Sequence, residues 1–227
     1  MRKIGIIAGL KRELRCLGLR RPAHTVTFAA AGSPERAYAR AQGWIASGRI
    51  GALMSFGLCG GLDPALASGT LIAAHEIVSA DGASWRFDES WARAIVARVP
   101  EARIAPILGV STAAVTPDEK AALFSRHKAP VIDMESRGIA EAAREAKLPF
   151  VALRAVADPA GRALPQTALH GFNAHGRLRP FRVMLGLLSR PGDFATLLAL
   201  AKEAGRGYDA LAGAVKKGAV APEVVPR

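Results

Sequence analysis

Short apolar, β-branched segments alternate with amphipathic segments along this chain. Residues 3–9 (KIGIIAG) and 150–158 (FVALRAVAD) have the continuous apolar composition of strands buried on both faces. Residues 35–47 follow a Ser-Pro pair, which is typical of a helix start. The alternation predicts an α/β fold, in which helices cover a largely parallel central sheet. Further strands are expected at 104–110 and 130–133, and further helices from Thr116 and over 135–147.

Glycines and acids gather where the apolar segments end. Ligands of open α/β sheets bind beyond the carboxyl ends of the strands, so these positions are candidate site residues. We expect residues 57–61 to form a glycine turn, whose backbone N–H groups can approach an anion or a hydroxyl. The turn matches neither a Walker A loop nor a dinucleotide fingerprint. The strand-end positions are Gly9–Glu13, Gly57–Gly61, Asp133–Glu135 and Asp158.

The chain carries a formal net charge of +12, which favours anionic partners such as phosphorylated substrates or acidic lipid. A composition rich in arginine explains the charge equally well. Aromatic residues make up only 6%, and no basic-aromatic motif occurs, so we expect no nucleic-acid partner. The two cysteines, Cys16 and Cys59, are too few for a disulfide scaffold and have no zinc spacing. We therefore expect no metal.

The segment that opens the chain does not have the pattern of a secretion signal. Its apolar run of seven residues ends at Lys11, and no run of about 18 apolar residues occurs elsewhere. We expect a cytoplasmic protein with a single domain over 1–213 and a basic, flexible tail over 214–227. Within the domain, residues 177–213 form a helical region. This region either packs on its own domain or presents apolar and basic side chains to the substrate or to the inner membrane.

Four segments occur together in an order that is informative: 5–13 (GIIAGLKRE), 56–64 (FGLCGGLDP), 133–136 (DMES) and 153–158 (LRAVAD). In this order and spacing they resemble the purine nucleoside phosphorylase/methylthioadenosine nucleosidase family, from residue 3 to about 165. The resemblance implies a three-layer α/β/α sandwich whose mostly parallel, mixed sheet is partly barrel-like. It also implies cleavage of an N-glycosidic bond by a homo-oligomer, with a dimer favoured.

The same resemblance implies a role for each strand-end acid. Asp158 matches the acid that protonates and contacts the purine, and Glu13 matches the acid that orients the nucleophile. Glu135 matches the carboxylate that holds the ribose hydroxyls, and Met134 should pack against the sugar. Taken singly, the acids also fit exposed helix positions (Glu13 and Glu135) or a turn cap (Asp158). The resemblance adds Ala114 and Val115 to the base pocket, and Gly9, Gly57 and Leu58 to the nucleophile loop.

Three positions depart from the family pattern. Leu58 stands where many members have a serine that binds phosphate or the nucleophilic water, and Ala157 replaces another frequent serine. Ser55 occupies a position at which the hexameric phosphorylases carry an arginine. These departures leave both water and inorganic phosphate open as the nucleophile. We expect no cofactor other than phosphate as a co-substrate.

A closer resemblance extends over nearly the whole chain. The segments SFGLCGGLDPAL, LRAVADPAGRALP and LLSRPGDFATLLALA look like phosphorylase-type proteins associated with bacterial hopanoid biosynthesis. This implies adenosylhopane, a lipid-nucleoside, as the substrate, with release of adenine and formation of ribosyl- or phosphoribosylhopane. One alternative is an ordinary 5′-methylthioadenosine/S-adenosylhomocysteine nucleosidase. Another is a non-catalytic module of the same fold that binds nucleosides or membranes.

Overall fold

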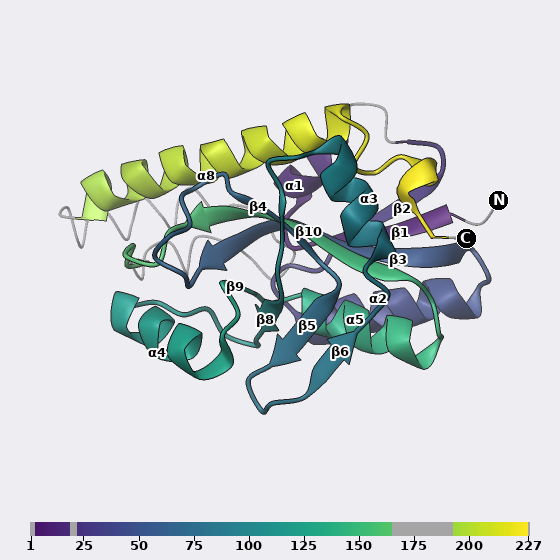
Figure 1. Ribbon diagram of the computed structural model, residues 1–227, viewed down its shortest axis with the longest axis horizontal. Coiled ribbons are helices and arrows are strands. Elements are labelled where there is room, and N and C mark those ends of the chain that lie inside the picture. Colours follow the sequence, from purple (N-terminus) through teal and green to yellow (C-terminus); the bar gives the residue numbers. More distant parts are fainter. Residues whose placement is uncertain (1–2, 19–21, 165–192, 227) are drawn as a thin grey trace.

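A mixed sheet of ten strands forms the centre of the computed structural model, which describes residues 3–18, 22–164 and 193–226 (Figure 1). The strands are β1 (Lys3–Ala8), β2 (Thr25–Ala29), β3 (Ile50–Gly61), β4 (Leu71–Ala74), β5 (Glu76–Ser79), β6 (Ser84–Arg86), β7 (Arg103–Ile104), β8 (Ile107–Gly109), β9 (Val131–Asp133) and β10 (Phe150–Asp158). Their order is β6-β5-β8-β9-β3-β10-β4-β7, and β1 joins β3 to β2. Most neighbouring strands are parallel; the antiparallel pairs are β3–β9, β4–β10 and β5–β6.

Helices cover both faces of the sheet, which confirms the expected α/β architecture (Figure 1). They are α1 (Lys11–Arg15), α2 (Pro34–Ala46), α3 (Ser90–Arg98), α4 (Pro117–His127), α5 (Ser136–Glu145) and α8 (Asp193–Lys216), with a short 3-10 helix at Pro222–Val224. Apolar residues of α2 and α5 share one core cluster, and those of α1, α3 and α8 share another. β10 contributes alternately to both: Val151 and Leu153 lie in one cluster, Ala152 and Val156 in the other. A strand buried on both faces has the continuous apolar sequence seen there.

The glycine segment at 57–61 is not a turn, as the sequence suggested, but the second half of β3. β1 pairs with the first half of β3, β10 pairs with β3 from Leu53 to Gly60, and the last two residues of β3, Gly60 and Gly61, pair with β9. Gly57 has φ +145, a backbone conformation that residues with a Cβ rarely adopt. The glycines therefore continue the strand while leaving room for other side chains to approach its backbone.

The C-terminal segment also differs from the expected flexible tail. Helix α8 runs through the expected boundary at residue 213 and ends at Lys216. Beyond it, Val220 and Val224 are buried in the core, and the imidazole of His24 hydrogen-bonds the carbonyl oxygen of Val220. The helical region predicted over 177–213 lies outside the described residues up to residue 192. Within the described part of the chain, no helix is both long enough and apolar enough to span a membrane.

Candidate functional site

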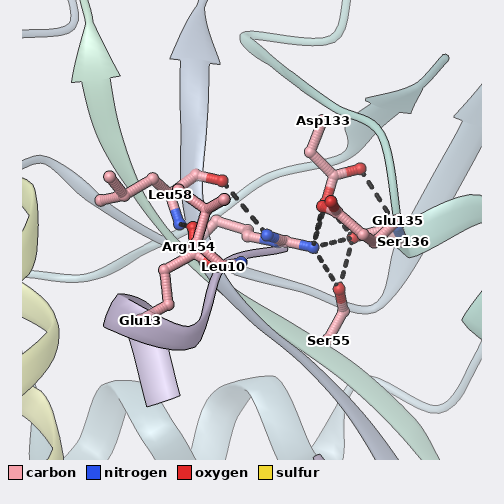
Figure 2. Close-up of polar contacts among 8 residues, drawn as sticks. All are labelled: Leu10, Glu13, Ser55, Leu58, Asp133, Glu135, Ser136 and Arg154. Carbon is pink, nitrogen blue, oxygen red and sulfur yellow. Dashed lines mark hydrogen bonds and ion pairs between the residues drawn. The ribbon is translucent and has the colours of Figure 1, made fainter. Parts of the chain in front are cut away.

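A fully buried arginine, Arg154, lies in the middle of β10 and forms hydrogen bonds and ion pairs with side chains from three other parts of the fold (Figure 2). Its Nη2 lies 2.6 Å from the Asp133 carboxylate, 2.6 Å from the Ser55 hydroxyl and 3.3 Å from Glu135 Oε2. Its Nη1 donates to the carbonyl oxygen of Leu58 at 3.1 Å. A guanidinium on a strand buried on both faces needs such partners, because an unpaired buried charge is very costly.

The start of α5 fixes the acids around this arginine. The N–H of Ser136 donates to Asp133 Oδ1 at 3.2 Å, and the Ser136 hydroxyl hydrogen-bonds the other oxygen of the same carboxylate. The Ser136 hydroxyl also bonds the Ser55 hydroxyl of β3 at 2.8 Å. Asp133 ends β9, so the junction from β9 to α5 is held against both central strands. This junction carries Glu135 toward Arg154.

Glu13 enters the same region from α1 and is only 3% exposed. One of its carboxylate oxygens accepts the N–H of Leu10 at 2.7 Å, and the other accepts the N–H of Leu58 at 2.9 Å (Figure 2). A Cβ atom at Gly57 would lie 2.5 Å from its carboxyl carbon, so only glycine allows this approach. Burial raises the pKa of Glu13, while Arg154 and the backbone donors act in the opposite direction. The result is a desolvated carboxylate of increased basicity.

Leu58 presents its backbone and its side chain to different neighbours. Its N–H contacts Glu13 and its carbonyl oxygen contacts Arg154. A Cβ atom at Gly207 of α8 would lie 2.6 Å from Leu58 Cδ2, so the side chain packs closely on that helix. The residue that replaces the family serine therefore contributes its peptide groups to the site, while its side chain fills the space below α8.

Glu135 lies opposite Glu13 across Arg154 and is also buried. Burial raises the pKa of Glu135 to about 7; Arg154 lowers it, and the nearby Asp133 and Glu13 raise it. A Cβ atom at Gly9 would lie 2.6 Å from Glu135 Oε1. The structure thus brings Glu13, Glu135, Gly9, Gly57 and Leu58 together. The neighbouring Met134 lies beside Gly32, where a Cβ atom would be 3.7 Å from its sulfur.

Asp158 ends β10, four residues beyond Arg154 and therefore roughly 13 Å further along the strand. Its Oδ2 lies 2.6 Å from Nζ of Lys120, a completely buried lysine of α4. Burial raises the pKa of Asp158, and the charge and hydrogen bond of Lys120 lower it. A Cβ atom at Gly60 would lie 3.3 Å from the same oxygen, so a second glycine of β3 makes room for an acid.

The two residues predicted for the base pocket lie just before α4. Ala114 is buried in a small apolar cluster with Leu62, Leu108 and Ile132. Val115 donates its N–H to Glu119 at 2.7 Å, and its carbonyl oxygen accepts the N–H of Leu164 at 2.8 Å. The N–H of Val115 is thus already used within the protein, so this donor is not open to a purine.

Sequence reasoning missed several residues of the site, namely Ser55, Lys120, Ser136 and Arg154. For Arg154 a signal existed: a lone charge inside an apolar strand predicts a buried acidic partner. For Lys120 there was none, because a lysine in a capped helix normally points to solvent. Among the residues that the structure describes, no cluster of His, Cys, Asp or Glu is placed to hold a metal ion.

Comparison with known proteins shows the family and the fold of this chain. The family model of the phosphorylase superfamily matches residues 18–188. No curated protein sequence matches the chain. Among solved structures, futalosine hydrolase of Helicobacter pylori strain 26695 has a TM-score of 0.68 at 15% identity, covering 95% of this chain and 97% of that one. The 5′-methylthioadenosine/S-adenosylhomocysteine nucleosidases of Helicobacter pylori and S. pneumoniae have TM-scores of 0.68 and 0.65, both at 16% identity. These matches cover 95% and 94% of this chain, and 98% of each nucleosidase chain. At such identities the structures show a shared fold.

Proposed function

The chain belongs to the phosphorylase superfamily and is an enzyme of the nucleoside phosphorylase or nucleosidase type, and on this premise we propose that it hydrolyses adenosylhopane to adenine and ribosylhopane. The observation that carries the reaction type is the arrangement of acids along β10. Two buried carboxylates, Glu13 and Glu135, flank Arg154 in the middle of the sheet, and a third buried acid, Asp158, ends the same strand. Cleavage of an N-glycosidic bond needs one group that accepts a proton from the nucleophile and one that gives a proton to the leaving base. Buried carboxyl groups at these two places can do both.

In the proposed reaction, the bond between ribose C1′ and the purine nitrogen breaks while a bond from a water oxygen to C1′ forms. Asp158 gives its proton to the purine ring, so the base leaves as neutral adenine. Glu13 accepts a proton from the attacking water, a role that its burial favours by raising its pKa. Glu135 holds the ribose hydroxyls and Met134 packs against the sugar. Positive charge develops on the ribose as the base leaves, and the carboxylates around it stabilise that charge.

Water fits this site better than phosphate does. The strand N–H of Leu58, which a phosphate would need, already donates to Glu13. Glu13 and Glu135 also place negative charge where a phosphate dianion would have to lie, which disfavours it. Arg154 Nε is buried and has no hydrogen-bond partner among the described residues, so a donor remains there for a water molecule.

An apolar substituent on the 5′ carbon is supported by the exposed part of α8. Leu198 is 63% exposed, and Leu197 and Leu200 are half-buried on the same turns. The same helix reaches the site, since its Gly207 packs against Leu58. A lipid-nucleoside requires an apolar surface as well as a polar site. The hopanoid resemblance of the sequence supplies the specific substrate.

Adenine release from adenosylhopane in detergent micelles tests the proposal. We expect release at the same rate with and without inorganic phosphate, and little release from 5′-methylthioadenosine. Asp158→Asn is the matched negative control. Strict dependence on phosphate would contradict the hydrolytic mechanism. Release from 5′-methylthioadenosine alone would contradict the lipid substrate and support the second candidate function, which the fold shared with methylthioadenosine nucleosidases favours.

Leu58→Ser restores the residue that many family members carry, and we expect it not to create a phosphate-dependent enzyme. The new hydroxyl would lie below α8, where the leucine side chain packs, and the N–H of residue 58 would still donate to Glu13. Lost packing should cost about 1–3 kcal/mol of unfolding free energy. Leu58→Ala is the control, because it loses the same packing without gaining a hydroxyl. Initial rates across a phosphate titration make the measurement, and phosphate activation in the serine variant alone would contradict the prediction.

A further inference from the structure

Lys120 is a buried lysine whose ammonium group is completely occupied. Its Nζ lies 2.6 Å from Asp158 Oδ2 and donates to the carbonyl oxygens of Pro159 and Arg162, each at 3.0 Å. An ammonium group has three N–H donors, and these three acceptors use all of them. Such a lysine stays charged and fixed in position, because every alternative arrangement leaves a buried donor or carboxylate without a partner.

The loop after β10, residues 159–164, is held by polar contacts from two sides, and the contacts of Lys120 are among them. On the side of α4, Lys120 binds two carbonyl oxygens of the loop, and the N–H of Leu164 bonds Val115. On the side of α8, the Arg162 guanidinium pairs with Glu203, with Nη2 2.5 Å from Oε1 and Nε 3.0 Å from Oε2. Asp158 is the residue just before this loop, and its carboxylate is held by the same ammonium group.

We propose that Lys120 is the positioning residue for Asp158: it holds one carboxyl oxygen, leaves the other to face the purine, and stabilises the carboxylate that forms when Asp158 has given its proton away. The inference rests on the proposed function, in which Asp158 protonates the leaving base. Lys120 keeps its own protons throughout; the single proton that moves passes from Asp158 to the purine ring. The reaction is easier because the anion is formed beside a fixed positive charge.

The proposal predicts a particular change in the pH dependence of the reaction. The groups that face Asp158 are Lys120 from α4 and Glu203 from α8, the latter paired with Arg162. Lys120 lowers the pKa of Asp158, whereas burial and Glu203 raise it. Without Lys120 the acid keeps its proton to higher pH, so the alkaline limb of kcat should move up by about one to three pH units. The plateau should fall, by about 10- to 100-fold, since the carboxylate is no longer stabilised.

Lys120→Met, which keeps the unbranched chain up to the Cε position and removes the ammonium group, is the test. Adenine release is measured from pH 5 to 10 for the wild type, for Lys120→Met and for Arg126→Met, an exposed charge on the same helix. We expect the lower plateau and the upward shift only in Lys120→Met. A lower rate with an unchanged alkaline limb would overturn the proposal, because loss of fold alone reduces the amount of active enzyme without moving its pH profile.

Two further variants keep the inference falsifiable. If Lys120→Met does not fold, Lys120→Gln keeps amide donors for the loop carbonyls and must show the same upward shift. In the double variant with Asp158→Asn, removing Lys120 should cost less than threefold beyond Asp158→Asn alone, since the residue acts through Asp158. Full additivity of the two losses would overturn the proposal. A wild type that releases no adenine would instead contradict the proposed function, so the two failures are distinguishable.

Discussion

Replacing Arg154 with methionine is expected to destabilise the fold by about 3–5 kcal/mol, the cost of leaving buried carboxylates without their partner. Arg154 contacts Asp133, Glu135 and three neutral oxygens, and it also lowers the pKa of Glu13. Methionine fills much of the volume and supplies none of these donors. The acids would then take up protons, and the site would lose both the charge and the geometry on which the proposed chemistry depends.

Urea unfolding monitored by circular dichroism measures this loss, with adenine release measured in parallel. Arg93→Met is the control, because Arg93 is 70% exposed in its ion pair with Glu89 and should change stability by less than about 1 kcal/mol. Arg154→Lys keeps the charge but cannot reach the acids and the Leu58 carbonyl oxygen together, so we expect intermediate stability. If the urea concentration at the unfolding midpoint were the same for Arg154→Met as for the wild type, the buried acids would not need a cation for stability.

The sequence carried enough information for the sheet and for the acids, because both follow from local patterns. β10 is an apolar segment between Pro149 and Asp158 with Arg154 as its one charged interior residue, and its position at the centre of the sheet follows from its burial on both faces. The acids follow strands, and the carboxyl ends of parallel strands meet at one edge of a sheet, which led us to expect Glu13 and Glu135 near each other. The two acids do meet, but for another reason. β9 is antiparallel to β3 and runs back along it toward Ser55, the residue that pairs with the end of β1.

The partners of these acids depend on long-range packing, which local patterns do not encode. Lys120 reaches Asp158 across 38 residues of sequence, and Arg154 reaches Ser55 across 99. The glycine segment was misjudged for a related reason. Glycine usually interrupts a strand, but Gly57 and Gly60 continue β3 because Glu13 and Asp158 occupy the space that side chains would fill. Contacts between a glycine of one strand and an acid from another element can be identified only when the pairing of the strands is known.

Glu13→Gln is expected to reduce adenine release by about 10²- to 10⁴-fold, the usual contribution of a general base. The carboxylate of Glu13 accepts one N–H group at each oxygen, from Leu10 and from Leu58. An amide can accept only one of them and turns its NH₂ toward the other, so the variant should also lose about 1–3 kcal/mol of stability. Glu35→Gln, at an exposed acid of α2, is the control; it should leave adenine release unchanged and cost less than about 1 kcal/mol of stability.

The pH dependence separates the catalytic effect of Glu13→Gln from its structural effect. A base acts only when ionised, and burial raises the pKa of Glu13, so activity of the wild type should fall on the acid side at a pH above the ordinary range of glutamate. The residual activity of Glu13→Gln should not show the part of this decline at acid pH that is caused by protonation of Glu13. A Glu13→Gln variant that keeps the full decline in activity at acid pH would contradict the assignment of Glu13 as the general base.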